Sequence, residues 1–424
     1  MLDVYGIPLL DCAGRGSVLL DRDDRIPVTF RCIQRADASI YAHVIPTIEE
    51  KQIAFSLLPL LNSNRLFKSL EGVLDDGIRF TSAGQMWGLS HNFSLSGNDS
   101  VFESKVMLSG FELTTVTEPN DSAAVLLRLP LTNLVFTGTE PYSPKPNRTI
   151  LILPLTINGI RATIYPVDGY KEIVEQMKAL KTCAITSVLE IPCDKLSVDE
   201  CLDLATNLCL LLSFARGTSI TWPYYQVLDR NQRVMSSIHT QTITSRFGSI
   251  AVIDSRQPNE LKDFVESTYE RFVQIMADYD LAKVIHAIYQ SKLDGSFAEL
   301  RALNVCSAVD VIRGRWASSH NRTTIFPSKI FQEGIKQVRD SFGVLVKQAL
   351  SATDEQANEM VKKLNEFNRM TFRSILEEMV LDLGADISSE EIGNFIRQRN
   401  LLTHEARFGT ESPGEGLMVI FNFA

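Results

Sequence analysis

The sequence lacks the features that would place a protein in a membrane, in a secretory pathway or around a zinc ion. Its seven cysteines are scattered, and no two have CxxC spacing, which argues against a zinc site. The N-terminus has no charged segment followed by an apolar one, so no signal peptide is indicated. The longest apolar stretch, residues 202–215, contains polar side chains and is too short to span a bilayer. We therefore expect a cytoplasmic protein with reduced thiols.

A surplus of basic residues is also absent. The chain has 42 Lys and Arg against 51 Asp and Glu, a formal net charge of −9, which argues against a protein that coats DNA or RNA with a basic face. Residues 260–424 hold 19 basic and 24 acidic side chains, a net charge of 19 − 24 = −5. Any contact with nucleic acid must therefore depend on a small local cluster of cations.

Glycine and proline become rare after residue 258, and this change divides the chain. With 424 residues, 45% of them hydrophobic and 22% charged, the chain is typical of a soluble globular protein of two or three domains. We expect an α+β multidomain protein. Its predicted parts are a β-rich N-terminal domain at 1–170, a mixed α/β connecting region at 171–258 and a helical domain at 259–424.

Short apolar runs separated by turn residues characterise the N-terminal domain. Examples are residues 18–20, 28–30, 39–41 and 124–129. This spacing predicts antiparallel strands in a sandwich or barrel-like region. Asn158-Gly159 between two β-rich runs is the strongest hairpin signal, because both residues tolerate a positive φ. Gly14 and Gly16 precede a strand and not a helix, so we reject them as a phosphate-binding loop.

The connecting region contains one well-marked helix. Ser197 and Glu200 form a capping box that opens it, and Gly217 ends it as a left-handed cap. Cys201 and Cys209 lie among its leucines and are predicted to be buried thiols. Alternating polar and apolar positions at 233–247 predict a further hairpin.

Long helical periods fill the C-terminal domain. The predicted helices span residues 260–275, 280–290, 297–316, 328–350, 353–383 and 389–402. Thr353 with Gln356 and Ser388 with Glu391 have the spacing of capping boxes, and Gly384 is placed as a C-cap. Short connections between such helices predict a helical bundle.

Arg399, Asn400 and His404 form the most informative motif of the chain. A guanidinium can hold phosphate oxygens through two parallel hydrogen bonds, and histidine exchanges a proton near neutral pH. Arg397 also meets the spacing, and we favour Arg399 because Asn400 follows it. On an ideal helix positions 399 and 404 are about 140° apart, so these side chains converge only if the helix ends or unwinds between them.

The helical region that ends in Arg399-Asn400-Leu401-Leu402-Thr403-His404 resembles the HEPN superfamily. The hallmark of that superfamily is an arginine, usually followed by a polar residue, with four to six residues between the arginine and a histidine. Residues 388–396 resemble the helix that leads into this motif. Residues 211–217, with Trp222-Pro223, are similar to bacterial proteins of the ApeA-like type, which join a β-rich N-terminal region to a C-terminal HEPN domain.

The resemblance implies a metal-independent endoribonuclease without a cofactor, of a kind often found in phage defence or toxin systems. His404 would act as a general base or acid, Arg399 would stabilise phosphate charge, and Asn400 would orient the histidine or bind the phosphate. It also implies RNA as the substrate and a homodimer formed through the helical domain. The N-terminal domain would then sense a phage or host component, and no membrane partner is expected.

Two other interpretations remain open. Arg399 and His404 could bind helix-end carbonyls or acidic neighbours such as Glu405, in which case the motif is structural. The helical domain could also be an inactive HEPN domain for binding or dimerisation, with the β-rich domain recognising a ligand or partner. Asp310, on an earlier predicted helix, could face the motif, although a solvated or paired carboxylate is the simpler expectation.

The end of the chain departs from the HEPN pattern. HEPN domains continue past the motif with a further long helix, whereas here the glycine-rich residues 409–416 are followed only by residues 417–423. We expect that the final helix is replaced by a short element or that the sequence is truncated. A missing helix would leave the apolar seam of the bundle uncovered.

Overall fold

A computed structural model describes most of the chain and divides it into two compact units, Met1–Phe272 and Val273–Ala424. The described residues are 9–20, 25–35, 38–47, 67–96, 99–115, 124–146, 148–241, 247, 251–254, 257–292, 297–409 and 413–423. Within this part of the chain, no helix is long and apolar enough to cross a membrane.

The division between the units falls inside helix α4 (Pro258–Tyr279), after Phe272, and not at residue 258. The first half of α4 packs on the β-rich unit. Phe264 stacks on Phe214 with ring centroids 6.4 Å apart, and the Tyr269 hydroxyl donates to the Leu204 carbonyl over 3.4 Å. Composition indicates where the helix begins, whereas packing decides to which unit each half of it belongs.

Among its described residues, the first unit contains antiparallel strands and, before α4, helices α2 and α3. In chain order these are β1 (Leu10–Leu20), β2 (Arg25–Gln34), β3 (Ile40–Pro46), β4 (Phe67–Leu74), β5 (Arg79–Ser96), β6 (Asp99–Thr114), β7 (Leu126–Thr132), β8 (Glu140–Lys145), β9 (Arg148–Ile157), β10 (Ile160–Pro166), α2 (Tyr170–Leu180), β11 (Ile185–Pro192), α3 (Val198–Arg216), β12 (Tyr224–Leu228) and β13 (Val234–Thr240).

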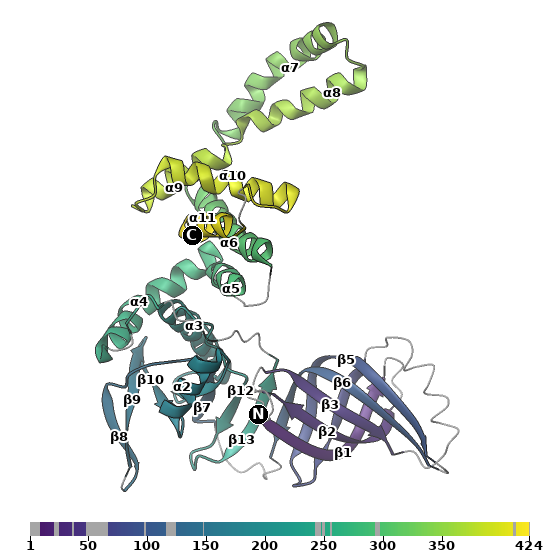
Figure 1. Ribbon diagram of the computed structural model, residues 1–424, viewed down its shortest axis with the longest axis vertical. Helices are drawn as coiled ribbons and strands as arrows, with labels where there is room; N and C mark the ends of the chain where they lie inside the picture. Colours follow the sequence, from purple (N-terminus) through teal and green to yellow (C-terminus); the bar gives the residue numbers. More distant parts are fainter. Residues whose placement is uncertain are drawn as a thin grey trace. The chain divides into compact units, whose positions relative to one another are not determined.

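The first six strands close into an antiparallel barrel (Figure 1). Their order is β3-β2-β1-β4-β5-β6, and β3 pairs with β6 to complete the ring. Closure satisfies the backbone groups that an open sheet would leave at its edges. The largest fully buried side chains of the barrel core are Ile40, Leu70, Phe80, Met86, Leu108 and Phe111. The structure thus confirms a β-rich antiparallel region at the N-terminus.

Glycines let β1 and β4 approach closely in the barrel wall. Gly16 lies opposite Gly72 in the strand register, and a Cβ on Gly16 would overlap the Glu71 carbonyl oxygen. A Cβ on Gly14 would overlap the Val73 carbonyl oxygen in the same way. These two glycines of β1 therefore serve strand packing.

The remaining strands extend the sheet in the order β13-β12-β7-β11-β10-β9-β8, starting from the C-terminal half of β6. Asn158 and Gly159 connect β9 and β10 with φ values of 49° and 75°, which confirms the predicted hairpin.

The hairpin predicted at 233–247 was placed wrongly, because β13 pairs with the preceding strand β12. The Asp229 carboxylate accepts from the backbone of Arg233 at 2.8 Å and sets that turn. Residues 242–246 lie outside the described residues.

Helix α3 begins and ends as its sequence predicts. The Ser197 backbone donates to the Glu200 carboxylate over 2.8 Å, the Glu200 backbone donates to the Ser197 hydroxyl over 3.2 Å, and Gly217 has a φ of 60°. Cys201 and Cys209 are buried, and burial raises the pKa of each thiol to about 12. Both cysteines are therefore neutral packing residues.

A buried polar contact joins the barrel to the adjoining strands. The His239 ring on β13 stacks on Phe111 and on Tyr224, with centroid distances of 4.4 and 4.8 Å. Its Nδ1 lies 2.7 Å from Gln34 Oε1 on β2, and its Nε2 lies 2.9 Å from Ser237 Oγ. Burial lowers the pKa of His239 to about 4, so this ring is neutral in the folded protein at neutral pH.

We expect His239 to make folding acid-sensitive. Between a pKa of about 6.5 in the unfolded chain and the folded value of about 4, the unfolded state binds a proton that the folded state excludes. Stability is therefore full above pH 6.5 and falls as the pH drops, by about 2 kcal/mol between about pH 8 and pH 5. Urea unfolding at both pH values should show this loss reduced in His239→Gln, whereas a matched change at the exposed His286 should leave it intact.

The second unit is helical. In chain order it contains the end of α4, α5 (Leu281–Ser291), α6 (Ala298–Ser319), α7 (Ser328–Leu350), α8 (Asp354–Lys363), the 3-10 helix η1 (Leu364–Asn368), α9 (Phe372–Asp382), α10 (Ser389–Glu405) and α11 (Pro413–Phe423). The structure confirms helices in the C-terminal part of the chain.

The single helix predicted at 353–383 is wrong, because α8 and α9 are separated by η1. The Asn368 side chain accepts from the Phe326 backbone and donates to its carbonyl, over 2.8 and 2.9 Å. Thr371 then caps α9 through the Ser374 backbone at 3.1 Å. Asn368 thus bonds to a segment more than forty residues away, which outweighs the local helical pattern.

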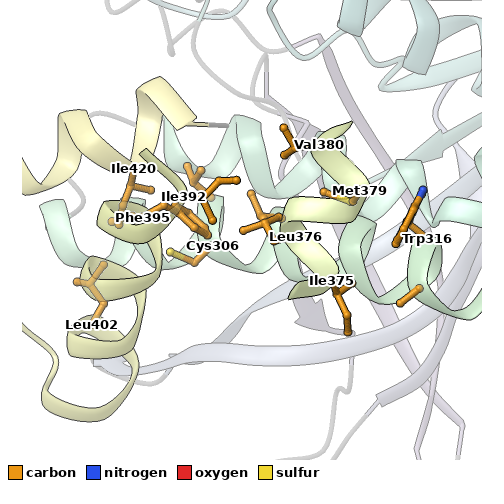
Figure 2. Packing of buried hydrophobic residues seen from close by; sticks show 14 of the residues in the cluster. Cys306, Trp316, Ile375, Leu376, Met379, Val380, Ile392, Phe395, Leu402 and Ile420 are labelled. Carbon is orange, nitrogen blue, oxygen red and sulfur yellow. The ribbon is translucent and has the colours of Figure 1, made fainter. Parts of the chain in front are cut away.

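The helical core is closed by a short helix at the end of the described chain. Figure 2 shows Ile420 of α11 beside Phe395 and Ile392 of α10. Ile420 and Phe395 are fully buried, and Phe423 stacks on Phe395 with ring centroids 4.1 Å apart. The seam that a missing helix would have exposed is therefore covered by the eleven residues of α11.

Candidate functional site

The candidate motif occupies the last two turns of α10. Ser388 and Glu391 form the predicted capping box at its start, with contacts of 2.8 and 3.2 Å. The buried side chains Ile392, Phe395 and Leu402 recur at helical spacing and hold one face of α10 on the core (Figure 2). This packing sets the face of α10 on which each motif residue lies.

Arg399 points toward helix α6 and helix α9. Its Nη2 donates to Asp310 Oδ2 on α6 over 2.9 Å, and its guanidinium lies 4.9 Å from the centre of the Phe372 ring on α9. Its Nη1 also donates to Asn400 Oδ1 over 3.1 Å. The Arg399 side chain is only 23% exposed and Asp310 is 31% exposed. Arg399, Asn400 and Asp310 are thus brought together, and Asp310 is a paired carboxylate.

A second arginine belongs to this cluster and was not singled out from the sequence. Arg313 Nε lies 3.8 Å from Asp310 Oδ1, and its guanidinium lies 4.3 Å from the centre of the Phe372 ring. Burial is the main cause that lowers the pKa of Arg313, and the Asp310 carboxylate opposes that effect. The spacing of three between Asp310 and Arg313 on a predicted helix is the signal that could have found it, because such residues share a helix face.

His404 is not part of this cluster. It is exposed in the last turn of α10, and the helix continues without a break to Glu405 before Ala406 ends it with a φ of 52°. An unbroken helix keeps positions 399 and 404 about 140° apart. The condition under which Arg399 and His404 would converge within one copy is therefore not met.

Arg397 and Gln398 directly precede the motif, and their hydrogen bonds are made to residues outside the Arg399 cluster. Arg397 is exposed, and its Nη2 lies 3.5 Å from Asn394 Oδ1. Gln398 is fully buried and accepts from the Gly409 backbone over 2.8 Å, which ties the chain that follows α10 back to the helix. Arg399, and not Arg397, is therefore the arginine that meets a second helix.

Within the described residues, no three His, Cys, Asp or Glu side chains gather in a way that could hold a metal ion. No known family model matches the chain, and comparisons with curated proteins and with solved structures also find no match. The candidate site therefore depends on its own geometry.

We expect the Arg399–Asp310 contact to stabilise the helical unit. Arg399→Ala would leave a partly buried carboxylate without its hydrogen-bonded partner, at a cost of about 1–2 kcal/mol in the free energy of unfolding. A double-mutant cycle with Asp310→Ala, measured by chemical denaturation, should return a coupling energy of about 1 kcal/mol. Arg397→Ala is the matched control on the same helix, and equal losses for Arg397 and Arg399 would contradict this assignment.

Proposed function

We propose that the chain is a metal-independent endoribonuclease of the HEPN type that acts as a homodimer. The observation that supports this proposal is the pair of features on one helix: Arg399 in a cluster with Arg313 and a single carboxylate, and His404 exposed less than two turns further on. A guanidinium cluster suits a phosphodiester, and a solvent-accessible imidazole suits proton transfer.

The proposed reaction is attack of the RNA 2′-hydroxyl on the adjacent phosphorus. The bond from the 2′-oxygen to phosphorus forms, the bond to the 5′-oxygen breaks, and the leaving oxygen takes a proton. His404 removes the proton from the 2′-hydroxyl or supplies the one that the leaving oxygen needs. Arg399 stabilises charge on the phosphate oxygens, and Asn400 holds the Arg399 guanidinium in place. The products are a 2′,3′-cyclic phosphate and a 5′-hydroxyl.

A second copy of the chain completes the proposed site. Arg399 and His404 point in different directions because the helix between them is unbroken. Within one copy, a phosphodiester that contacts Arg399 is therefore out of reach of His404. In a twofold dimer formed through the helical domain, Arg399 of one copy would face His404 of the other. The β-rich unit would act as sensor or regulator in phage defence or toxin-type growth arrest.

A second candidate function is supported by the Arg399–Asp310 contact itself. A guanidinium that already has a carboxylate partner at 2.9 Å is suited to a structural role. The helical domain would then be a catalytically inactive module for binding or dimerisation, and the β-rich unit would recognise a ligand or partner. The two candidates differ in what they require of His404.

His404→Ala should separate the two candidates, because the exposed His404 contributes little to packing. We expect a loss of RNA cleavage of about 100-fold or more, the contribution typical of an acid–base group. Growth inhibition on overexpression should disappear, with a melting temperature unchanged within about 1 °C. His286→Ala, at another exposed histidine of the same unit, is the control. Full cleavage and toxicity in His404→Ala would leave only the inactive module.

Subunit complementation should test the shared site. Arg399→Gln and His404→Ala, each inactive alone, should regain about one quarter of wild-type cleavage when mixed after dissociation and reassociation. Half of the dimers would then be mixed, and each mixed dimer would contain one complete site. Sedimentation should show a dimer in all samples. No recovery in a proven mixed dimer would rule out a site built from two copies.

A further inference from the structure

The Arg313–Asp310–Arg399 cluster carries more positive charge than its neighbours neutralise. Asp310 Oδ2 accepts a hydrogen bond from Arg399 Nη2 over 2.9 Å, whereas Asp310 Oδ1 lies 3.8 Å from Arg313 Nε. Both guanidiniums also lie within 5 Å of the Phe372 ring centre. Two cations and one carboxylate leave a net charge of +1 in a space where the charged side chains are 21–31% exposed.

The hydrogen-bonding capacity of the cluster is also incomplete. The Nε atoms of Arg313 and Arg399 and the Oδ1 atom of Asp310 are buried, and none has a hydrogen-bond partner among the described residues. A guanidinium has five N–H donors, and one carboxylate cannot satisfy two guanidiniums in parallel geometry. Asp310 Oδ1 faces Arg313 Nε at 3.8 Å, and the two Nε donors are costly to bury without partners, so an acceptor is expected to compensate for these donors.

The contacts of Arg313 with the Phe372 ring and, at 3.8 Å, with Asp310 leave its Nε donor without a hydrogen-bond partner. An apolar side chain at this position would pack on Phe372 without the cost of placing a second cation beside Arg399. The charge of the cluster and its unused donors both call for an anion with several oxygens. A phosphate group meets this requirement, because its oxygens accept from two guanidiniums at the same time.

We propose that Arg313 and Arg399 together form one phosphate-binding site for a phosphodiester of RNA, with Arg313 as the second phosphate ligand. This inference rests on the proposed function and adds a residue outside the sequence motif. Asp310 is the positioning residue, because it holds Arg399 against α6 and leaves the guanidinium of Arg313 available. The bound phosphate supplies the negative charge that the cluster lacks.

Binding of a 2′-O-methyl RNA oligonucleotide, which cannot be cleaved through its 2′-oxygen, tests the proposal on the full chain. We expect Arg313→Gln to weaken binding about tenfold and to make the negative slope of log K against log salt shallower by about 0.7, the value for one contact to a single strand. Arg313→Lys should lose less, because it keeps the charge but not the fork of donors. Thermal unfolding of each variant checks that it is folded.

The matched control is Arg315→Gln, which makes the same charge change on the same helix. Arg315 forms its own ion pair with Asp280 and is 50% exposed, so its loss should change affinity less than twofold. Equal affinity losses for Arg313→Gln and Arg315→Gln would overturn the proposal. It would also be overturned if inorganic phosphate raised the melting temperature through Arg313 while oligonucleotide binding did not depend on Arg313, because the ligand would then be free phosphate.

Cleavage assays distinguish this inference from the proposed function. Arg313-dependent binding without any cleavage by the wild type would support the phosphate site and refute the ribonuclease. Cleavage that depends on His404 but keeps its KM in Arg313→Gln would support the ribonuclease and refute Arg313 as a phosphate ligand.

Discussion

The unbroken course of α10 is the constraint on which the candidate site depends. The Ser388 capping box sets where the helix begins, and the buried residues Phe395 and Leu402 set how it is rotated on the core. Because the start of α10 and its rotation on the core are both fixed, Arg399 faces α6 and α9 while His404 faces solvent. Chemistry that needs both side chains at one phosphodiester must therefore draw on a second copy, because a continuous helix cannot bring them together.

The cluster of Arg313, Asp310 and Arg399 has a net positive charge, whereas the whole protein has a net negative charge. The chain has a net charge of −9, yet Arg313 and Arg399 share a single carboxylate. An acidic protein attracts nucleic acid weakly at long range, so the RNA recognition proposed above depends on short-range contacts at this site. The acidic composition argues against general nucleic-acid binding. A local pair of arginines that shares one carboxylate is nevertheless consistent with a specific phosphate site in an acidic protein.

Elements with strong local signals were predictable, and elements that depend on distant contacts were not. Asn158-Gly159 and the box at Ser197 act within a few residues, so the hairpin and the start of α3 followed from the sequence. The barrel is closed by pairing between β3 and β6, which are far apart in the chain. The break between α8 and α9 depends on Asn368 bonding to Phe326, which no local pattern reveals.

The candidate site also has a part that could be predicted from local sequence and a part that depends on distant contacts. The sequence by itself determined the order of a β-rich region before helices, the capped start of α10 and the presence of Arg399, Asn400 and His404 on it, because these depend on neighbouring residues. Only the tertiary structure decided that Asp310, 89 positions away, pairs with Arg399 and that Arg313 joins them. Those contacts arise where α6, α9 and α10 pack together, and packing between distant helices cannot be read from local spacing.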